Sequence, residues 1–241
     1  PHIKNYCCFI KFNKTQFFSD SKLNYAENIL KKKSDGIAMN FLSEKGFEEN
    51  ITWNDLYKKV CKFSSYLKKL NLKKGDRVGA YVPNKIESVV CFLACAKNGI
   101  IWSSCSPDFG VQGVVDRFKQ IEPKVFITCD YYYYNGKKIN ILDKVKEILK
   151  LIPSIKKVIA FNYNKKERES LKNFINFGET LKNNLDEVFE RFEFNHPIYI
   201  LFSSGTTGKP KCITHGSGNV LIEHNKELSL IHISEPTRLT R

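Results

Sequence analysis

The sequence lacks the CxxC pairs, and the histidines to go with them, that a zinc site requires. Its eight cysteines stand at positions 7, 8, 61, 91, 95, 105, 129 and 212. Cys91 and Cys95 lie one helical turn apart in an apolar run, a placement typical of small buried thiols rather than of a disulfide framework. We therefore expect no metal site, and a reducing compartment, which we take to be the cytoplasm.

The sequence also lacks a long apolar run and the apolar core of a signal peptide. A membrane-spanning helix needs roughly 18 apolar residues in succession, and no run here approaches that length. We expect a soluble protein without a membrane span. Since the first residue is Pro1 and not methionine, we also expect the chain to be truncated at both ends.

Arginine is scarce, with six among the 39 basic residues, although the formal net charge is +14. A basic surface attracts polyanions whatever its fold, so a basic nucleic-acid-binding protein is one hypothesis. The lysines are spread along the chain, however, and no basic stripe with interleaved aromatic residues is present. Coding bias explains this composition more simply, and we expect no nucleic-acid partner. Retention on a polyanion column that is lost at modest salt would favour the hypothesis of a nucleic-acid-binding protein.

Hydrophobic residues make up 42% of the chain, which is enough for a sizeable core. Their pattern predicts strands at Ile37 to Phe41, Glu49 to Thr52, Arg77 to Val82, Ile100 to Cys105, Lys124 to Thr128, Val158 to Phe161 and Ile198 to Phe202. It predicts helices that begin near Leu23, Thr52, Ile86, Val111 and Ile139. Because strands and helices alternate, the sequence predicts a layered α/β fold with a largely parallel sheet.

Two segments between these elements are expected to lie outside the sheet. Tyr131 to Tyr134, followed by Asn135-Gly136, is expected to form a surface loop. The charged stretch from Asn164 to Asn176 is expected to be an insertion. No flexible linker marks an independent second domain.

The most informative stretch follows the strand that ends at Phe202 and reads Ser203-Ser204-Gly205-Thr206-Thr207-Gly208-Lys209-Pro210-Lys211. Its two glycines let the backbone turn sharply towards an anion, its hydroxyl and amide groups can donate to phosphate oxygens, and its two lysines supply positive charge. A generic cluster of this composition is a solvent-exposed loop, which is the simpler interpretation. The other common phosphate loop, GxxxxGK[ST], is excluded because Pro210 stands where that pattern needs glycine.

Strand and loop together resemble, residue for residue, the phosphate-binding signature of the adenylate-forming enzymes. This superfamily contains acyl-CoA synthetases, luciferases and the adenylation domains of peptide synthetases. Ile101 to Gly110 (IWSSCSPDFG) and Gln120 to Lys124 (QIEPK) are similar to its acetoacetyl-CoA synthetase branch, as is Leu221 to His224. Leu23 to Asn28 resembles the segment that leads into the short-chain acyl-CoA synthetases. The resemblance implies a layered αβα part of the large N-terminal domain of that superfamily, incomplete in this chain.

The resemblance also implies an activity, the ATP-dependent ligation of acetoacetate to coenzyme A. A carboxylate attacks the α-phosphorus of ATP to give an acyl-adenylate and pyrophosphate, and the thiol of coenzyme A then displaces AMP. Mg²⁺ and preorganised donors would offset the charge that develops on the pyrophosphate. The residues implied to bind the nucleotide are Ser203, Ser204, Gly205, Thr206, Thr207, Gly208, Lys209 and Lys211. Acetyl- or propionyl-CoA synthetase is an alternative, as is a non-catalytic relic of the fold.

No catalytic residue is predicted within this sequence, because the resemblance places the acyl and adenine pockets and the catalytic lysine downstream of the loop. We therefore expect this chain by itself to be inactive. His215 could contact a ligand or serve packing, and we leave it out of the site. Cys212 is interpreted as a packing residue, because no neighbouring base or helix N-terminus is evident that would lower its pKa.

Three parts are predicted along the chain: a lead-in segment at 1–35, a partial AMP-binding domain at 36–227, and a tail at 228–241. Up to Glu227 there are four arginines and 33 lysines, whereas the tail has two arginines and no lysine. The tail resembles the in-frame translation of a sequencing adapter, so we expect it to be non-native. An ordinary polar tail is the alternative, and codons other than the adapter's would establish it.

Overall fold

The structure, a computed structural model, describes residues 18–167, 171–203 and 208–234. At its centre is a seven-stranded sheet with the strand order β10-β9-β6-β4-β5-β12-β13. Its strands are β4 (Arg77–Tyr81), β5 (Ile101–Cys105), β6 (Val125–Cys129), β9 (Lys157–Phe161), β10 (Ile175–Asn176), β12 (Pro197–Ser203) and β13 (Lys211–Gly216). Neighbouring strands are parallel except β12 and β13, which form an antiparallel hairpin.

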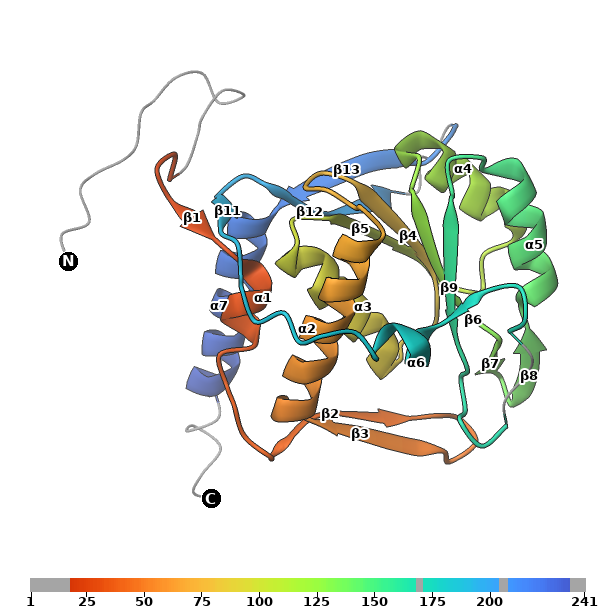
Figure 1. Cartoon of the computed structure of the whole chain (residues 1–241), viewed down its shortest axis with the longest axis horizontal. Helices are drawn as coiled ribbons and strands as arrows, with labels where there is room; N and C mark the ends of the chain where they lie inside the picture. The colour runs from red at the N-terminus through yellow and green to blue at the C-terminus, as the bar shows by residue number, and fades with distance from the viewer. Residues whose placement is uncertain (1–17, 168–170, 204–207, 235–241) are drawn as a thin grey trace.

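Helices cover both faces of this sheet. They are α1 (Tyr25–Ile29), α2 (Trp53–Lys69), α3 (Ile86–Lys97), α4 (Val111–Ile121), α5 (Leu142–Leu151), α6 (Phe177–Thr180) and α7 (Ser217–Ser234). Helix α3 packs with α1 and α2, whereas α4 packs with α5 (Figure 1). The chain runs from β4 to β5 through α3 and then crosses back past β4 to β6 through α4. Right-handed crossovers in opposite directions place their helices on opposite faces, which confirms the predicted αβα layering.

The central strands and α2 show why this sequence folds in this way. Every residue of β6 is buried, as expected of a parallel strand that is covered on both faces. At the start of α2, Thr52 Oγ1 accepts a hydrogen bond from the backbone N–H of Asp55 at 3.1 Å and so caps the helix predicted to begin near Thr52. The apolar stripe of α2 is at most 2% exposed and consists of Leu56, Val60, Phe63 and Leu67. Burial of such a side chain contributes about 1.5–3 kcal/mol.

Three two-stranded antiparallel sheets surround the central one. They are β1 (Lys22–Leu23) with β11 (Phe192–Glu193), β2 (Ile37–Leu42) with β3 (Glu48–Thr52), and β7 (Tyr131–Tyr134) with β8 (Lys137–Asn140). The hairpin of β2 and β3 contacts α2 and α3, so the first two predicted strands form correctly but stay outside the central sheet.

The predicted surface loop at Tyr131 to Tyr134 is wrong. These residues form β7, and Tyr131 and Tyr132 are buried. The turn to β8 has positive φ at both central residues, 49° at Asn135 and 72° at Gly136, which is the geometry that joins two twisted antiparallel strands. The helix predicted from Ile139 begins instead at Leu142, because Ile139 pairs within β8.

Two further segments differ from their predictions. The charged stretch that ends at Asn176 finishes as β10, an edge strand parallel to β9, so it is not wholly an insertion. The helix predicted to begin near Leu23 is α1, which begins at Tyr25 and has only five residues. At its start the Asn24 side chain accepts from the Glu27 N–H and donates to the carbonyl oxygens of Lys97 and Glu190. Residues 1–17 of the lead-in segment and 235–241 of the tail lie outside the described residues.

Candidate functional site

The phosphate-loop signature connects the two strands of the β12-β13 hairpin. Strand β12 ends at Ser203 and β13 begins at Lys211, and these two residues pair across the ladder. Gly208 has φ of 117°, in the region that favours glycine. The structure therefore brings the described members, Ser203, Gly208, Lys209 and Lys211, to one end of the hairpin. The other predicted members, Ser204, Gly205, Thr206 and Thr207, lie outside the described residues.

The described ends of this loop carry positive charge without a carboxylate beside it. Lys209 and Lys211 are exposed, and neither ammonium forms an ion pair with a carboxylate of the described residues. Such a loop offers charge and hydrogen-bond donors to phosphate oxygens. The described ends of the loop contain no carboxylate, and Mg²⁺ at nucleotide sites is bound largely through carboxylates and substrate phosphates. Here the metal would be held through the phosphates of its nucleotide.

The two residues just beyond the loop do not act as a catalytic pair. The His215 ring packs on the Tyr199 ring with centroids 4.9 Å apart, which gives the histidine a packing role. Cys212, interpreted from the sequence as a packing residue and not a nucleophile, is exposed, so it does not pack in the interior. Desolvation raises the pKa of its thiol, which disfavours the reactive thiolate. Cys91 and Cys95 are confirmed as buried thiols, and burial raises the pKa of both.

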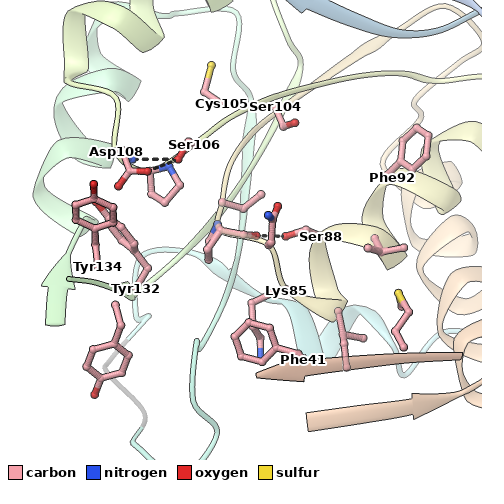
Figure 2. Close-up of a pocket in the computed structure, with 18 of the residues that line it drawn as sticks. Phe41, Lys85, Ser88, Phe92, Ser104, Cys105, Ser106, Asp108, Tyr132 and Tyr134 are labelled. Atoms are coloured by element: carbon pink, nitrogen blue, oxygen red, sulfur yellow. Dashed lines mark hydrogen bonds between the residues drawn. The ribbon is translucent and has the colours of Figure 1, made fainter. Parts of the chain in front are cut away.

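A pocket of about 780 Å³ opens at the carboxyl ends of β4 and β5 (Figure 2). Its walls come from strand β2, the turn from β4 into α3 with the first turns of α3, strand β5 with the turn after it, and strand β7. Strands β5 and β6 lie on either side of β4, so the strand order reverses here. Open α/β sheets bind ligands at such points.

The pocket and the phosphate loop share one edge of the sheet. Strands β5 and β12 are parallel neighbours, with Trp102 opposite Tyr199. Both strands run towards this edge: β5 ends at Cys105 and leads into Ser106 of the pocket wall, and β12 ends at Ser203, where the loop begins. A ligand in the pocket and an anion on the loop would therefore be neighbours.

The floor of the pocket contains a compensated cluster of charges. Lys85 has a side chain only 1% exposed, with its ammonium 2.5 Å from Glu49 and 3.7 Å from Glu87. Lys165 also pairs with Glu49. Burial by itself would raise the pKa of Glu49, but hydrogen bonds from Lys165 and Lys85 outweigh it and hold that pKa below its usual value.

The opposite wall presents polar groups to the pocket. Asp108 accepts a hydrogen bond from Ser106 Oγ at 2.7 Å, and Figure 2 shows the two side chains together beside Tyr132. Burial raises the pKa of Tyr132, and the neighbouring Asp108 carboxylate raises it further. Tyr134 is 57% exposed at the mouth. This wall therefore combines a carboxylate acceptor with phenol groups.

Sequence reasoning missed this pocket. The available signal was that Pro83-Asn84 and Ser106-Pro107-Asp108 each follow a buried strand directly. What the pattern did not reveal is that β2 and β7, which belong to separate small sheets, close the pocket from the side.

Other absences concern only the part of the chain that the structure describes. In that part, no three or more His, Cys, Asp or Glu residues are grouped so that they could hold a metal ion. Within the same residues, no helix combines the length and the apolar character that crossing a membrane requires.

Comparison with known proteins identifies the class to which this loop and fold belong. The family model of the AMP-binding enzyme matches residues 26–233. The chain belongs to this family.

Particular relatives narrow the resemblance. The acetoacetyl-coenzyme A synthetase of Rhizobium meliloti (strain 1021) is 43% identical over 218 residues, which cover 88% of this chain and 33% of that protein. The acetoacetyl-CoA synthetase of Macaca fascicularis is 41% identical over 229 residues, which cover 90% of this chain and 34% of that protein. The solved structure of acetoacetyl-CoA synthetase from Streptomyces lividans superimposes with a TM-score of 0.84 at 36% identity. The superposition covers 89% of this chain and 33% of that one. The predicted resemblance is confirmed, and the chain spans about a third of the length of these relatives.

Proposed function

We propose that this chain supplies the nucleotide-binding part of an enzyme that ligates acetoacetate to coenzyme A at the expense of ATP. The observation that carries the proposal is the loop between β12 and β13, where two exposed lysines and a left-handed glycine stand at the edge of the sheet. The names of the relatives support acetoacetate as the acyl substrate. Acetyl- or propionyl-CoA synthetase is the alternative, and substrate profiling of a full-length protein with this chain distinguishes them.

The residues of the loop would act by stabilising charge. As the carboxylate attacks the α-phosphorus, negative charge develops on the departing pyrophosphate. Lys209 and Lys211 would offset that charge, while Ser203 and the backbone around Gly208 would donate to phosphate oxygens. Mg²⁺ would supply further positive charge when bound with ATP. Ser204, Gly205, Thr206 and Thr207 belong to the proposed set on the sequence pattern.

The neighbouring pocket provides room for a second reactant. A volume of about 780 Å³ lies within the usual range for small-molecule sites. Acetoacetate is far smaller than this volume, so we assign the pocket to a part of coenzyme A. The nearness of Ser106 to the loop would bring that reactant towards the bound nucleotide.

The test neutralises both lysines in a full-length protein that carries this chain. We expect Lys209→Met with Lys211→Met to lower kcat/KM for ATP at least about tenfold, since hydrogen bonds to charged groups contribute about 1.5–3 kcal/mol each. The control is Lys58→Met with Lys150→Met, which removes the same charge from exposed positions on α2 and α5. Normal ATP affinity and turnover in the loop variant would exclude the proposal.

We propose the cytoplasm as the location. The support is that the six cysteines of the described residues are free thiols, five of them buried. Such thiols persist in a reducing compartment. Imaging of a tagged protein inside an organelle would contradict this location.

A further inference from the structure

Helix α4 contacts the end of the phosphate loop through one side-chain amide. Gln120 Nε2 donates to the carbonyl oxygen of Pro210 at 2.9 Å, across 90 residues of sequence. The same nitrogen donates to the carbonyl oxygen of Asp116 at 2.7 Å, and Oε1 accepts from Cys212 Sγ at 3.5 Å. With both amide hydrogens and the oxygen engaged, the Gln120 side chain is held in one orientation between the helix and the loop.

The same helix contacts the beginning of the loop. The Arg117 guanidinium lies 4.4 Å from the ring centroid of Phe109 and 6.0 Å from that of Phe202. Phe202 is the residue before Ser203, where the loop starts. Since residues three apart lie on one face of a helix, one face of α4 reaches both ends of the loop (Figure 1).

The Pro210 carbonyl is a point where the hairpin needs support from outside. Strand β13 is the edge of the central sheet, so within the described residues it pairs only with β12. Its ladder begins at Lys211, and Pro210 has no N–H with which to extend it. A displacement of the backbone at Pro210 would move the lysines on both sides of it.

We propose that Gln120 is a positioning residue for nucleotide binding, which holds Pro210 so that Lys209 and Lys211 face the phosphates. The inference rests on the proposed function of the loop. Without the amide donor the loop would sample other conformations in the free protein, and ATP binding would have to order it again. ATP should therefore bind more weakly, whereas the acyl substrate should not be affected.

The experiment compares two glutamines of α4 in a full-length protein that carries this chain. Gln120→Met removes the donor and keeps the length and helix propensity of the side chain. Gln112→Met is the matched control, because Gln112 is also exposed on α4 but donates to Asp116 Oδ1 at 2.6 Å and not to the loop. The readouts are KM for ATP and for acetoacetate, kcat in ATP–pyrophosphate exchange, and the melting temperature.

For Gln120→Met we expect KM for ATP to rise about threefold to tenfold, the effect of one hydrogen bond, with KM for acetoacetate and melting temperature unchanged. Gln120→Glu, which keeps an acceptor but lacks the donor, should weaken ATP binding at least as much as Gln120→Met does. Gln112→Met should match the unmodified protein.

An unchanged KM for ATP in Gln120→Met would overturn the inference and leave the proposed function intact. Equal effects of the two methionine variants, or a rise in both KM values together with a lower melting temperature, would also overturn it. Absence of ATP-dependent exchange in the unmodified protein would overturn the proposed function itself, and the inference with it.

Discussion

Lys85 shows how strongly one residue of this fold depends on its partners. Its ammonium lies 4.5 Å from the Phe41 ring centroid and 5.1 Å from that of Phe47, and its side chain is almost fully buried. Burying a charge in such a place is costly unless a paired opposite charge compensates it. Glu49 does so across 36 residues of sequence. The sequence could not reveal the pair, because only the packing of the β2-β3 hairpin against α3 brings the two together.

We expect Lys85→Met to lower the free energy of unfolding by about 3–5 kcal/mol, because it removes the buried cation beside Glu49 and Glu87 and leaves them only the half-exposed Lys165. Lys165→Met is the matched control, since Lys165 pairs with the same Glu49 but is 52% exposed. Lys165→Met should lower the free energy of unfolding by about 1 kcal/mol or less. Urea unfolding of the three proteins measures the difference, and equal losses would contradict this account.

At the scale of elements, prediction succeeded where local pattern alone decides the structure. The helix predicted to begin near Ile86 begins at that residue in the structure, because its run of apolar residues and the proline before it define it locally. Prediction failed at β7, β8 and β10, which are short strands defined by their partners. The β13 strand was missed in the same way, since its ladder partner lies beyond the phosphate loop.

Helix α7 bears on the tail that we assign to an adapter. It runs from Ser217 to Ser234, through the first seven residues of that tail. Helical structure does not distinguish a native residue from a foreign one, because a short apolar run continues a helix whatever its origin. The non-native origin of 228–241 stays a prediction that the codons test.

Two glycines, one before β4 and one after α3, allow the effect of backbone strain on stability to be distinguished from that of side-chain crowding. Gly75 and Gly99 have φ of 85° and 66°, and Gly75 N–H donates to the Gly99 carbonyl oxygen at 2.9 Å. A Cβ on Gly75 would have no neighbour within 4 Å, whereas one on Gly99 would lie 2.7 Å from the Phe192 ring.

We expect Gly75→Ala to destabilise the protein by about 1–2 kcal/mol through its left-handed backbone alone. Gly99→Ala should destabilise the protein by about 1–3 kcal/mol more than Gly75→Ala does, because the Phe192 ring must also move. Thermal or urea unfolding measures both, and a smaller loss at Gly99 than at Gly75 would show that β11 yields to the extra carbon.

At the scale of the whole molecule, the chain spans about a third of the length of its relatives. We expect the 241 residues alone to form no acetoacetyl-adenylate, because the proposed phosphate loop supplies no acyl pocket of its own. Incubation with ATP, Mg²⁺ and acetoacetate, followed by mass spectrometry, measures the product against a full-length protein as control. Adenylate formed by the isolated chain would contradict the expectation.

The sequence by itself determined the alternation of strands and helices, the stripe of α2, and the phosphate loop. Each depends on residues close together in the chain, whose periodicity or motif is complete within a short segment. Only the tertiary structure decided that Gln120 contacts Pro210, that Lys85 contacts Glu49, and that a pocket opens at the edge of the sheet where the loop lies. These contacts join residues far apart in the chain, and they exist because the parallel sheet aligns the carboxyl ends of its strands along one edge.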